Sequence, residues 1–347
     1  MTKQCFKNAA FVRMLITVLS VVCLHTTDAQ IGASYGTIGD DLPPATEVLA
    51  LCNQYNIQRI RLYNPNPSVL QALQGNINIS VIVGVANEDI IRIASDAKLA
   101  KSWVRNNILK YENVNFRYIA VGNEISPLDG GSAGIAPSVV PAMQNIYNAI
   151  SAFGLGGKVK VSTALSFAVL GTSYPPSAGA FRPEIQSSYI NPIVQFLAKT
   201  RGPFLVNVYP YFAYVSNPND IHLDYALFTS PSIVVRDGKY QYQNLFDAMV
   251  DATHAALQKV GGDVEVVVTE TGWPSAGGTA TTVDNARSYN SNLIKSVRKG
   301  TPRKPGKPIE TYIFDLIDEN QKSPEIEKHW GLFLPNKQPK YPISFAK

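Results

Sequence analysis

Eight short apolar runs alternate with longer amphipathic segments along the chain, and this alternation limits the possible folds more than any other feature. Each run is rich in β-branched residues and has no polar face, as expected of a strand that is buried on both sides. Strands of this kind belong to parallel sheets, where helices cover both faces. The runs span residues 31–36, 58–63, 79–85, 116–123, 159–165, 204–209, 264–269 and 310–316.

Helical patterns lie between these runs, most clearly at residues 44–55, 139–153, 245–260 and 283–297. Strands that alternate with helices pair in parallel through right-handed crossovers, either in a closed barrel or in an open doubly wound sheet. A phosphate-binding GxGxxG motif does not follow the first run, which weakens the open-sheet dinucleotide hypothesis. Eight runs in 347 residues favour an α/β fold of the (β/α)8 TIM-barrel type.

One connection is longer than the others. Residues 212–243, after the sixth run, are rich in Tyr, Asn, Pro and Ser. In a barrel this segment would form an extended loop or small subdomain at the carboxyl-terminal rim, beside the active site.

The first 29 residues have the layout of a secretory signal peptide. Lys3, Lys7 and Arg13 precede an apolar run at 14–24, and Ala29 offers a small residue before a cleavage site. We therefore expect one catalytic domain at 30–347, secreted and without a membrane span. After cleavage Cys52 is the one cysteine, so no internal disulfide is expected and a buried thiol is favoured.

Charge and histidine spacing exclude several classes of function. The formal net charge is +5, and the basic residues are scattered, which argues against nucleic-acid binding. The four histidines lack metal-ligand spacing, and no GxSxG nucleophile motif occurs. We expect no metal or cofactor, and a monomer.

Two carboxylates stand where barrel enzymes place catalytic groups. Glu124 ends the fourth run (VGNE), and Glu270 ends the seventh (VTE). An ionisable group at the end of a buried strand is costly unless it faces a polar cleft. A pair of opposed carboxyl groups suits glycosidic bond cleavage, in which one protonates the leaving oxygen and the other attacks or activates water; a separation of about 5–5.5 Å would mean retention.

Other residues near the strand ends suit a sugar-binding cleft. Aromatic side chains can stack on the apolar faces of glucose rings, and Asn123 can hydrogen-bond a hydroxyl group. Lys322 could keep the nucleophile ionised, with Glu319 positioning that lysine. Glu327 and Lys328 are interpreted as part of a solvated loop. The aromatic residues near strand ends include Tyr63, Tyr209, Tyr211, Phe212, Tyr214 and Trp273.

Several blocks in order along the chain resemble the plant glucan endo-1,3-β-glucosidases of glycoside hydrolase family 17. The blocks are IGASYGTIGDDLPP, VGNEISP, YPPSAGAF, VNVYPYFAY, ETGWPSAG and DENQK…EKHWGLF. The resemblance implies a barrel with an open cleft, which hydrolyses internal 1,3-β-D-glucosidic bonds of 1,3-β-glucan with retention and without a cofactor. It implies Glu124 as proton donor and Glu270 as nucleophile. It also implies a cleft lined by Tyr63, Asn123, Tyr209, Glu319 and Lys322, with Phe314 and Trp330 as further candidates.

Some residues depart from the family pattern. Ala33-Ser34 replaces a frequent Val-Cys pair, and His329-Trp330 replaces a polar–Phe pair. The sequence lacks the carboxyl-terminal extension of basic vacuolar members, which favours the cell wall or apoplast over the vacuole. Two alternatives stay open: an endohydrolase of mixed-linkage 1,3;1,4-β-glucan, and a glucan-binding wall protein without hydrolytic activity.

Overall fold

Eight parallel strands close into a barrel in the computed structural model, which describes residues 31–345. Neighbouring strands follow the order β1-β14-β11-β8-β5-β4-β3-β2 around the barrel. This arrangement confirms the predicted TIM-barrel class. The barrel strands are β1 (Ile31–Ser34), β2 (Arg59–Leu62), β3 (Ser80–Val85), β4 (Asn115–Asn123), β5 (Lys160–Ser166), β8 (Phe204–Asn207), β11 (Val266–Thr271) and β14 (Thr311–Ile313).

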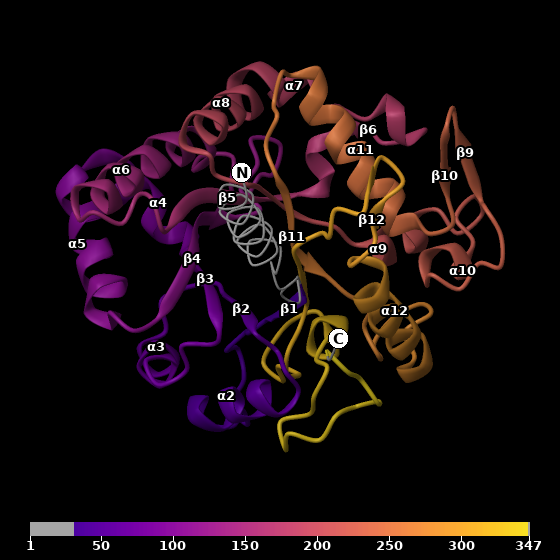
Figure 1. The fold of residues 1–347 in the computed structure, drawn as a ribbon, viewed down its shortest axis with the longest axis horizontal. Helices are drawn as coiled ribbons and strands as arrows, with labels where there is room; N and C mark the ends of the chain where they lie inside the picture. Colours follow the sequence, from indigo (N-terminus) through magenta and orange to yellow (C-terminus); the bar gives the residue numbers. More distant parts are fainter. Residues whose placement is uncertain (1–30, 346–347) are drawn as a thin grey trace, which may run out of the picture.

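Helices surround the strands on the outside of the barrel (Figure 1). The four predicted helices all form and end within one or two residues of the expected positions. Side-chain caps explain two of the starts, since Asn244 accepts from Asp247 N and Thr282 accepts from Asn285 N. The helices are α2 (Ala45–Gln54), α3 (Pro67–Leu73), α4 (Ile90–Ser95), α5 (Ala97–Asn107), α6 (Val139–Ala152), α7 (Pro183–Ile185), α8 (Asn191–Thr200), α9 (Pro210–Ser216), α10 (Leu223–Ala226), α11 (Leu245–Lys259) and α12 (Val283–Ser296).

The long connection after β8 forms a small subdomain, as predicted. It contains α9, α10 and a hairpin of β9 (Val235–Asp237) and β10 (Tyr240–Tyr242), which lies at the periphery of the molecule (Figure 1). The Tyr242 hydroxyl donates to Asp251 Oδ2 of α11 at 3.0 Å, which anchors the hairpin to the barrel wall. Two further short hairpins pair β6 (Leu170–Thr172) with β7 (Ala180–Phe181), and β12 (Gly300–Thr301) with β13 (Lys304–Pro305).

The last barrel strand is shorter than the predicted run at 310–316. The backbone of Asp315 leaves the sheet, because its N–H donates to Trp330 O and its carbonyl accepts from Leu332 N. Phe314 N and Leu316 N still donate to Thr271 O of β11 and to Ser34 O of β1, so the segment continues to the mouth of the barrel, where Phe314 lies.

The barrel interior is apolar in the middle and polar at both ends. Seven buried side chains fill the middle. Arg61 lies toward the carboxyl ends of the strands, and Glu310 lies toward their amino ends. A larger apolar core, which includes the predicted buried thiol Cys52, packs the helices onto the barrel. The interior side chains are Ile82, Tyr118, Ala120, Ala164, Leu205, Val267 and Tyr312.

The predicted signal peptide, residues 1–29, lies outside the described residues. Between residues 31 and 345, no helix is both long and apolar enough to cross a bilayer.

Candidate active site

Both predicted carboxylates lie at the carboxyl ends of barrel strands, and each follows an irregularity in strand pairing. The register of β4 against β5 shifts between Ala120 and Asn123, and that of β11 against β8 shifts between Val268 and Glu270. Such bulges change the direction of the side chains that follow. Glu124 also has a positive φ of 53°, a conformation that is costly outside glycine and often found at functional sites. The local backbone therefore directs both carboxylates to the rim.

Glu270 is buried and accepts hydrogen bonds on both carboxylate oxygens. Arg61 Nη1 lies 2.8 Å from Oε1, and the Tyr63 hydroxyl donates to the same oxygen at 3.0 Å. The Tyr209 hydroxyl donates to Oε2 at 2.7 Å. Burial and then the charge of Glu270 raise the pKa of Tyr63 and of Tyr209 well above the usual range, so both phenols remain donors. These donors hold the Glu270 carboxylate in one orientation.

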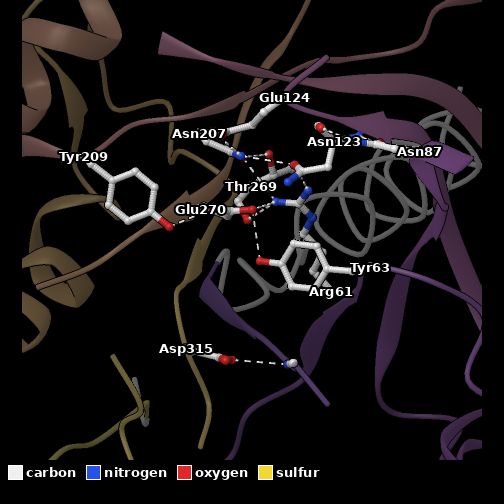
Figure 2. A network of polar contacts seen from close by, with 11 residues as sticks. Arg61, Tyr63, Asn87, Asn123, Glu124, Asn207, Tyr209, Thr269, Glu270 and Asp315 are labelled. Carbon is white, nitrogen blue, oxygen red and sulfur yellow. Dashed lines mark hydrogen bonds and ion pairs between the residues drawn. The ribbon is translucent and has the colours of Figure 1, made fainter. Parts of the chain in front are cut away.

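Arg61 organises the floor of the site (Figure 2). It is buried in β2, and its guanidinium also donates to Asn123 Oδ1 at 2.7 Å, to Asn207 Oδ1 at 3.1 Å and to the carbonyl of Thr269 at 3.0 Å. The guanidinium carbon lies 4.6 Å from the centre of the Tyr63 ring. Arg61 therefore connects strands β2, β4, β8 and β11 at one point.

Glu124 has a different environment, in which no residue between 31 and 345 forms an ion pair with it. Asn207 Nδ2 donates to its Oε1 at 2.9 Å, and Thr269 Oγ1 donates to Asn207 Oδ1 at 2.8 Å, which orients the amide. The Glu124 side chain reaches solvent at the rim, yet enough protein surrounds it for burial to raise its pKa. Burial first, and then the charge of Glu270, raise the pKa of Glu124 to about 7. Glu124 thus has a raised pKa and one neutral donor, whereas Glu270 has an ion pair with Arg61.

Two adjoining hollows form a groove across this rim. The larger has a volume of about 360 Å³ and includes Glu270, Phe314, Glu319 and Lys322 in its walls. The smaller, about 220 Å³, lies over Arg61, Asn87 and Asn123. They share four residues, so they form one continuous groove: Leu62, Tyr63, Asn64 and Asn123.

The structure brings most of the predicted binding residues to this groove. Tyr63, Asn123, Phe314, Glu319 and Lys322 line the larger hollow. Lys322 Nζ lies 2.7 Å from Glu319 Oε2, as predicted for a positioned lysine. The cation paired with Glu270 is Arg61, however, and Lys322 instead lies 4.3 Å from the centre of the Phe314 ring.

The predictions for Trp273 and Glu327 were also wrong. Trp273 is fully buried, and its indole N–H donates to Ala280 O at 2.9 Å, so it supports the rim and cannot stack on a sugar. Its ring packs between Tyr211 and Tyr289. Glu327 is not part of a solvated loop, because it is half-buried and lines the larger hollow. Trp330, the weaker candidate, is buried behind Tyr209 and Phe314.

Sequence reasoning missed Arg61, Asn207, Thr269 and Asn87. A signal existed for Arg61, since a charged residue in the buried run QRIRLY needs a partner. Asn207 likewise interrupts the apolar run FLVNVY. Asn87 exchanges two hydrogen bonds with the backbone of Asn123, at 2.8 and 3.0 Å, and carried no comparable signal because it lies after the apolar run, at the start of a short 3-10 helix.

Within residues 31–345, no cluster of three or more His, Cys, Asp or Glu side chains is placed to bind a metal ion. The groove presents carboxylates, phenols, amides and one lysine amine. A TIM barrel that carries two carboxyl groups of contrasting environment at its carboxyl-terminal rim has the architecture of a glycoside hydrolase.

Comparisons with known proteins agree with this class. The sequence profile described as glycosyl hydrolases family 17 matches residues 31–345, and the chain belongs to this family. The chain is 54% identical over 319 residues to a basic isoform of glucan endo-1,3-beta-glucosidase from Phaseolus vulgaris, covering 91% of each sequence. It is 51% identical over 338 residues to the basic vacuolar isoform GLB of glucan endo-1,3-beta-glucosidase from Nicotiana tabacum, covering 95% of this chain and 90% of that one.

A solved structure is also similar. CJP38, a beta-1,3-glucanase and allergen of Cryptomeria japonica pollen, superposes with a TM-score of 0.88 at 46% identity, covering 91% of this chain and 99% of that one.

Proposed function

We propose that this chain is a retaining endohydrolase of 1,3-β-glucans, with Glu124 as proton donor and Glu270 as nucleophile. The observation that carries the proposal is the contrast between the two carboxyl groups. Arg61, Tyr63 and Tyr209 stabilise Glu270 as an anion, while the pKa of Glu124 is raised to about 7. Environments that separate two carboxyl pKa values assign one group as acid and the other as base or nucleophile.

The reaction would proceed in two displacements. Glu270 attacks the anomeric carbon while the glycosidic C–O bond breaks, and the Glu124 proton passes to the leaving oxygen. A covalent glycosyl-enzyme ester results, and Glu124 is then ionised. Glu124 next takes a proton from water, which attacks the anomeric carbon, releases Glu270 and restores the starting state.

The groove supports cleavage within a polymer. Its two hollows adjoin each other along the rim, and Glu270 lies in the wall of the larger one, so several sugar units of a polymer can lie beside this carboxylate. Exposed or half-buried aromatic rings near it, at Tyr63, Tyr209 and Phe212, suit the apolar faces of glucose. The substrate class comes from the relatives, whose names specify 1,3-β-glucan.

The test is product analysis by NMR with laminarin and with mixed-linkage 1,3;1,4-β-glucan. We expect shorter oligosaccharides from laminarin, released first as the β anomer. Initial release of the α anomer would overturn retention. Cleavage of the mixed-linkage polymer alone would favour an endohydrolase of 1,3;1,4-β-glucan. Absence of turnover on either glucan would favour a glucan-binding protein without hydrolytic activity.

We further propose that residues 1–29 direct the chain into the secretory pathway and that the catalytic unit acts as a monomer. The apolar run at 14–24 after three basic residues supports the first point. A fluorescent fusion imaged in plant cells would distinguish the cell wall from the vacuole, the compartment named for the tobacco relative.

A further inference from the structure

A second pair of carboxyl groups lies beside the groove on the side of β1: Glu319 lines the larger hollow, and Asp315 lies next to it near Gly36. Both residues are almost fully buried, with exposed fractions of 2% and 1%. The two carboxyl groups meet at Gly36, whose N–H donates to Asp315 Oδ1 and whose Cβ position lies 2.3 Å from Glu319 Oε2. Two carboxyl groups buried side by side cannot both be ionised without a large cost, so such a pair shares one proton. The question is which of the two holds it.

Glu319 has the contacts of the ionised member. Its Oε1 accepts from Ile38 N at 2.6 Å, and its Oε2 lies 2.7 Å from Lys322 Nζ. It packs tightly on the end of β1, because a Cβ atom at Gly36 would lie 2.3 Å from Oε2. A cation, a backbone donor and a close steric contact therefore hold this carboxylate.

In the part of the chain that the structure describes, no cation forms an ion pair with Asp315. Its Oδ1 accepts from Leu316 N at 2.5 Å and from Gly36 N at 3.4 Å, the contact drawn below Tyr63 in Figure 2. Among the described residues, its buried Oδ2 has no hydrogen-bond donor. A protonated Oδ2 would instead be a donor, and the adjacent carboxylate of Glu319 is the available acceptor.

We propose that Asp315 is a positioning residue, which remains protonated and donates its proton in a hydrogen bond to Glu319. The bond holds Glu319 and Lys322 as one oriented ion pair in the groove wall beside Glu270. The importance of this ion pair for turnover rests on the proposed function; the protonation state does not.

The surroundings support this assignment of the proton. Burial and then the charge of Glu319 raise the pKa of Asp315 well above its usual range. Burial would also raise the pKa of Glu319, but the hydrogen bond from Asp315 and the charge of Lys322 lower it overall. Other titratable groups that face Asp315 are Tyr35, Tyr63, Lys322 and Lys340.

Ionisation of Asp315 would disturb the site in two ways. A second anion would compete with Glu319 for Lys322 and move that lysine from its place over Phe314. It would also place negative charge near Tyr63, whose hydroxyl donates to Glu270. Protonated Asp315 avoids both effects and leaves the ion pair of Glu319 with Lys322 undisturbed.

The test compares Asp315→Asn, which keeps a neutral donor, with Asp315→Leu, which removes it. Infrared difference spectra of the full chain at pH 8–9 should show a protonated-carboxyl C=O stretch that the wild type has and Asp315→Asn lacks. With laminarin, Asp315→Leu should raise KM by about tenfold through loss of a hydrogen bond to a charged group, and Asp315→Asn should recover most of that loss. Asp284→Asn, on the exposed surface, is the control.

Absence of the carboxyl stretch would overturn the proposal, as would a wild-type KM in Asp315→Leu. If Asp315→Leu does not fold, the infrared spectrum of Asp315→Asn still shows whether Asp315 is protonated in the wild type. If the wild type does not hydrolyse laminarin, the proposed function fails, while the infrared comparison continues to test the proton on Asp315.

Discussion

Arg61 Nη1 lies 2.8 Å from Glu270 Oε1, and this buried ion pair joins the second and seventh strands of the barrel. The same guanidinium donates to Asn123, which precedes Glu124 in the sequence, and to Asn207, whose amide donates to Glu124. One side chain thus orients the proposed nucleophile directly and the proposed proton donor through its neighbours. Arg61 is therefore the residue on which the geometry of the whole site depends.

Arg61→Lys should reduce kcat on laminarin by roughly 100-fold. Lysine keeps the charge but lacks the planar fork that reaches several acceptors at once. Loss of one preorganised donor costs about 10²–10³ in rate in well-studied sites. Arg92→Lys is the matched control, because Arg92 forms an exposed pair with Asp89 at 2.6 Å and should behave like wild type. Equal kcat values for Arg61→Lys and Arg92→Lys would show that the guanidinium of Arg61 does not contribute to catalysis.

Glu270→Gln should lower kcat by about 10⁴ or more, the range seen when a nucleophile is removed. The glutamine has nearly the same shape and can still accept from Arg61 and Tyr63, so binding of laminari-oligosaccharides should persist. Isothermal titration calorimetry would measure the binding, and reducing-end release would measure turnover. Glu112→Gln, an exposed change just before β4 at the opposite end of the barrel, is the control. Turnover of Glu270→Gln within tenfold of wild type would contradict the nucleophile assignment.

The sequence predicted the barrel and its two carboxylates because both depend on local patterns. Apolar runs mark buried strands, and the carboxyl ends of parallel strands meet at one rim. The contacts of Arg61 could not be read in this way, since Asn207 and Thr269 lie 146 and 208 positions away along the chain. The error at Trp273 has the same origin, because α12 supplies the Tyr289 ring that covers it.

The pH dependence of kcat/KM should fall on its alkaline side as pH rises through about 7, the value to which the pKa of Glu124 is raised. Protonated Glu124 is the active form, so the rate decreases as this proton is lost. NMR titration of labelled Glu124 in Glu270→Gln should give a lower pKa than in wild type, because the neighbouring negative charge is gone. An unchanged pKa would mean that the two carboxyl groups do not interact.

Glu124→Gln should make the protein more resistant to heat at pH 8 than the wild type, with little difference at pH 4. The folded-state pKa of about 7 exceeds the ordinary value of 4.5, so the folded chain binds this proton more tightly than the unfolded chain does. Stability therefore decreases as pH rises from about 4.5 to about 7, and glutamine avoids this loss. Scanning calorimetry of both proteins across this range measures it. If the melting temperatures of the two proteins changed with pH in parallel, ionisation of Glu124 would not lower the stability of the fold.

Glu310→Gln should reduce the free energy of unfolding by about 3 kcal/mol without changing kcat. Glu310 is buried just before β14, at the end of the barrel opposite the groove, and Arg59 and Arg117 both pair with it, at 3.0 and 2.8 Å. Removal of the shared carboxylate leaves two cations close together, and breaking a buried ion pair costs about 3–5 kcal/mol. The lower end of that range applies because Arg117 is partly exposed and Glu265 lies nearby to offset some of the charge.

Asp284→Asn is the control for Glu310→Gln, since Asp284 forms an exposed pair with Arg287 at 3.0 Å and should cost less than about 0.5 kcal/mol. Urea denaturation followed by tryptophan fluorescence gives the free energies, and laminarin turnover gives kcat. A large fall in kcat with unchanged stability would mean that Glu310, at the end of the barrel opposite the groove, contributes to the reaction. The expected result instead separates two polar ends of one barrel: Arg61 with Glu270 for catalysis, and Glu310 with its arginines for stability.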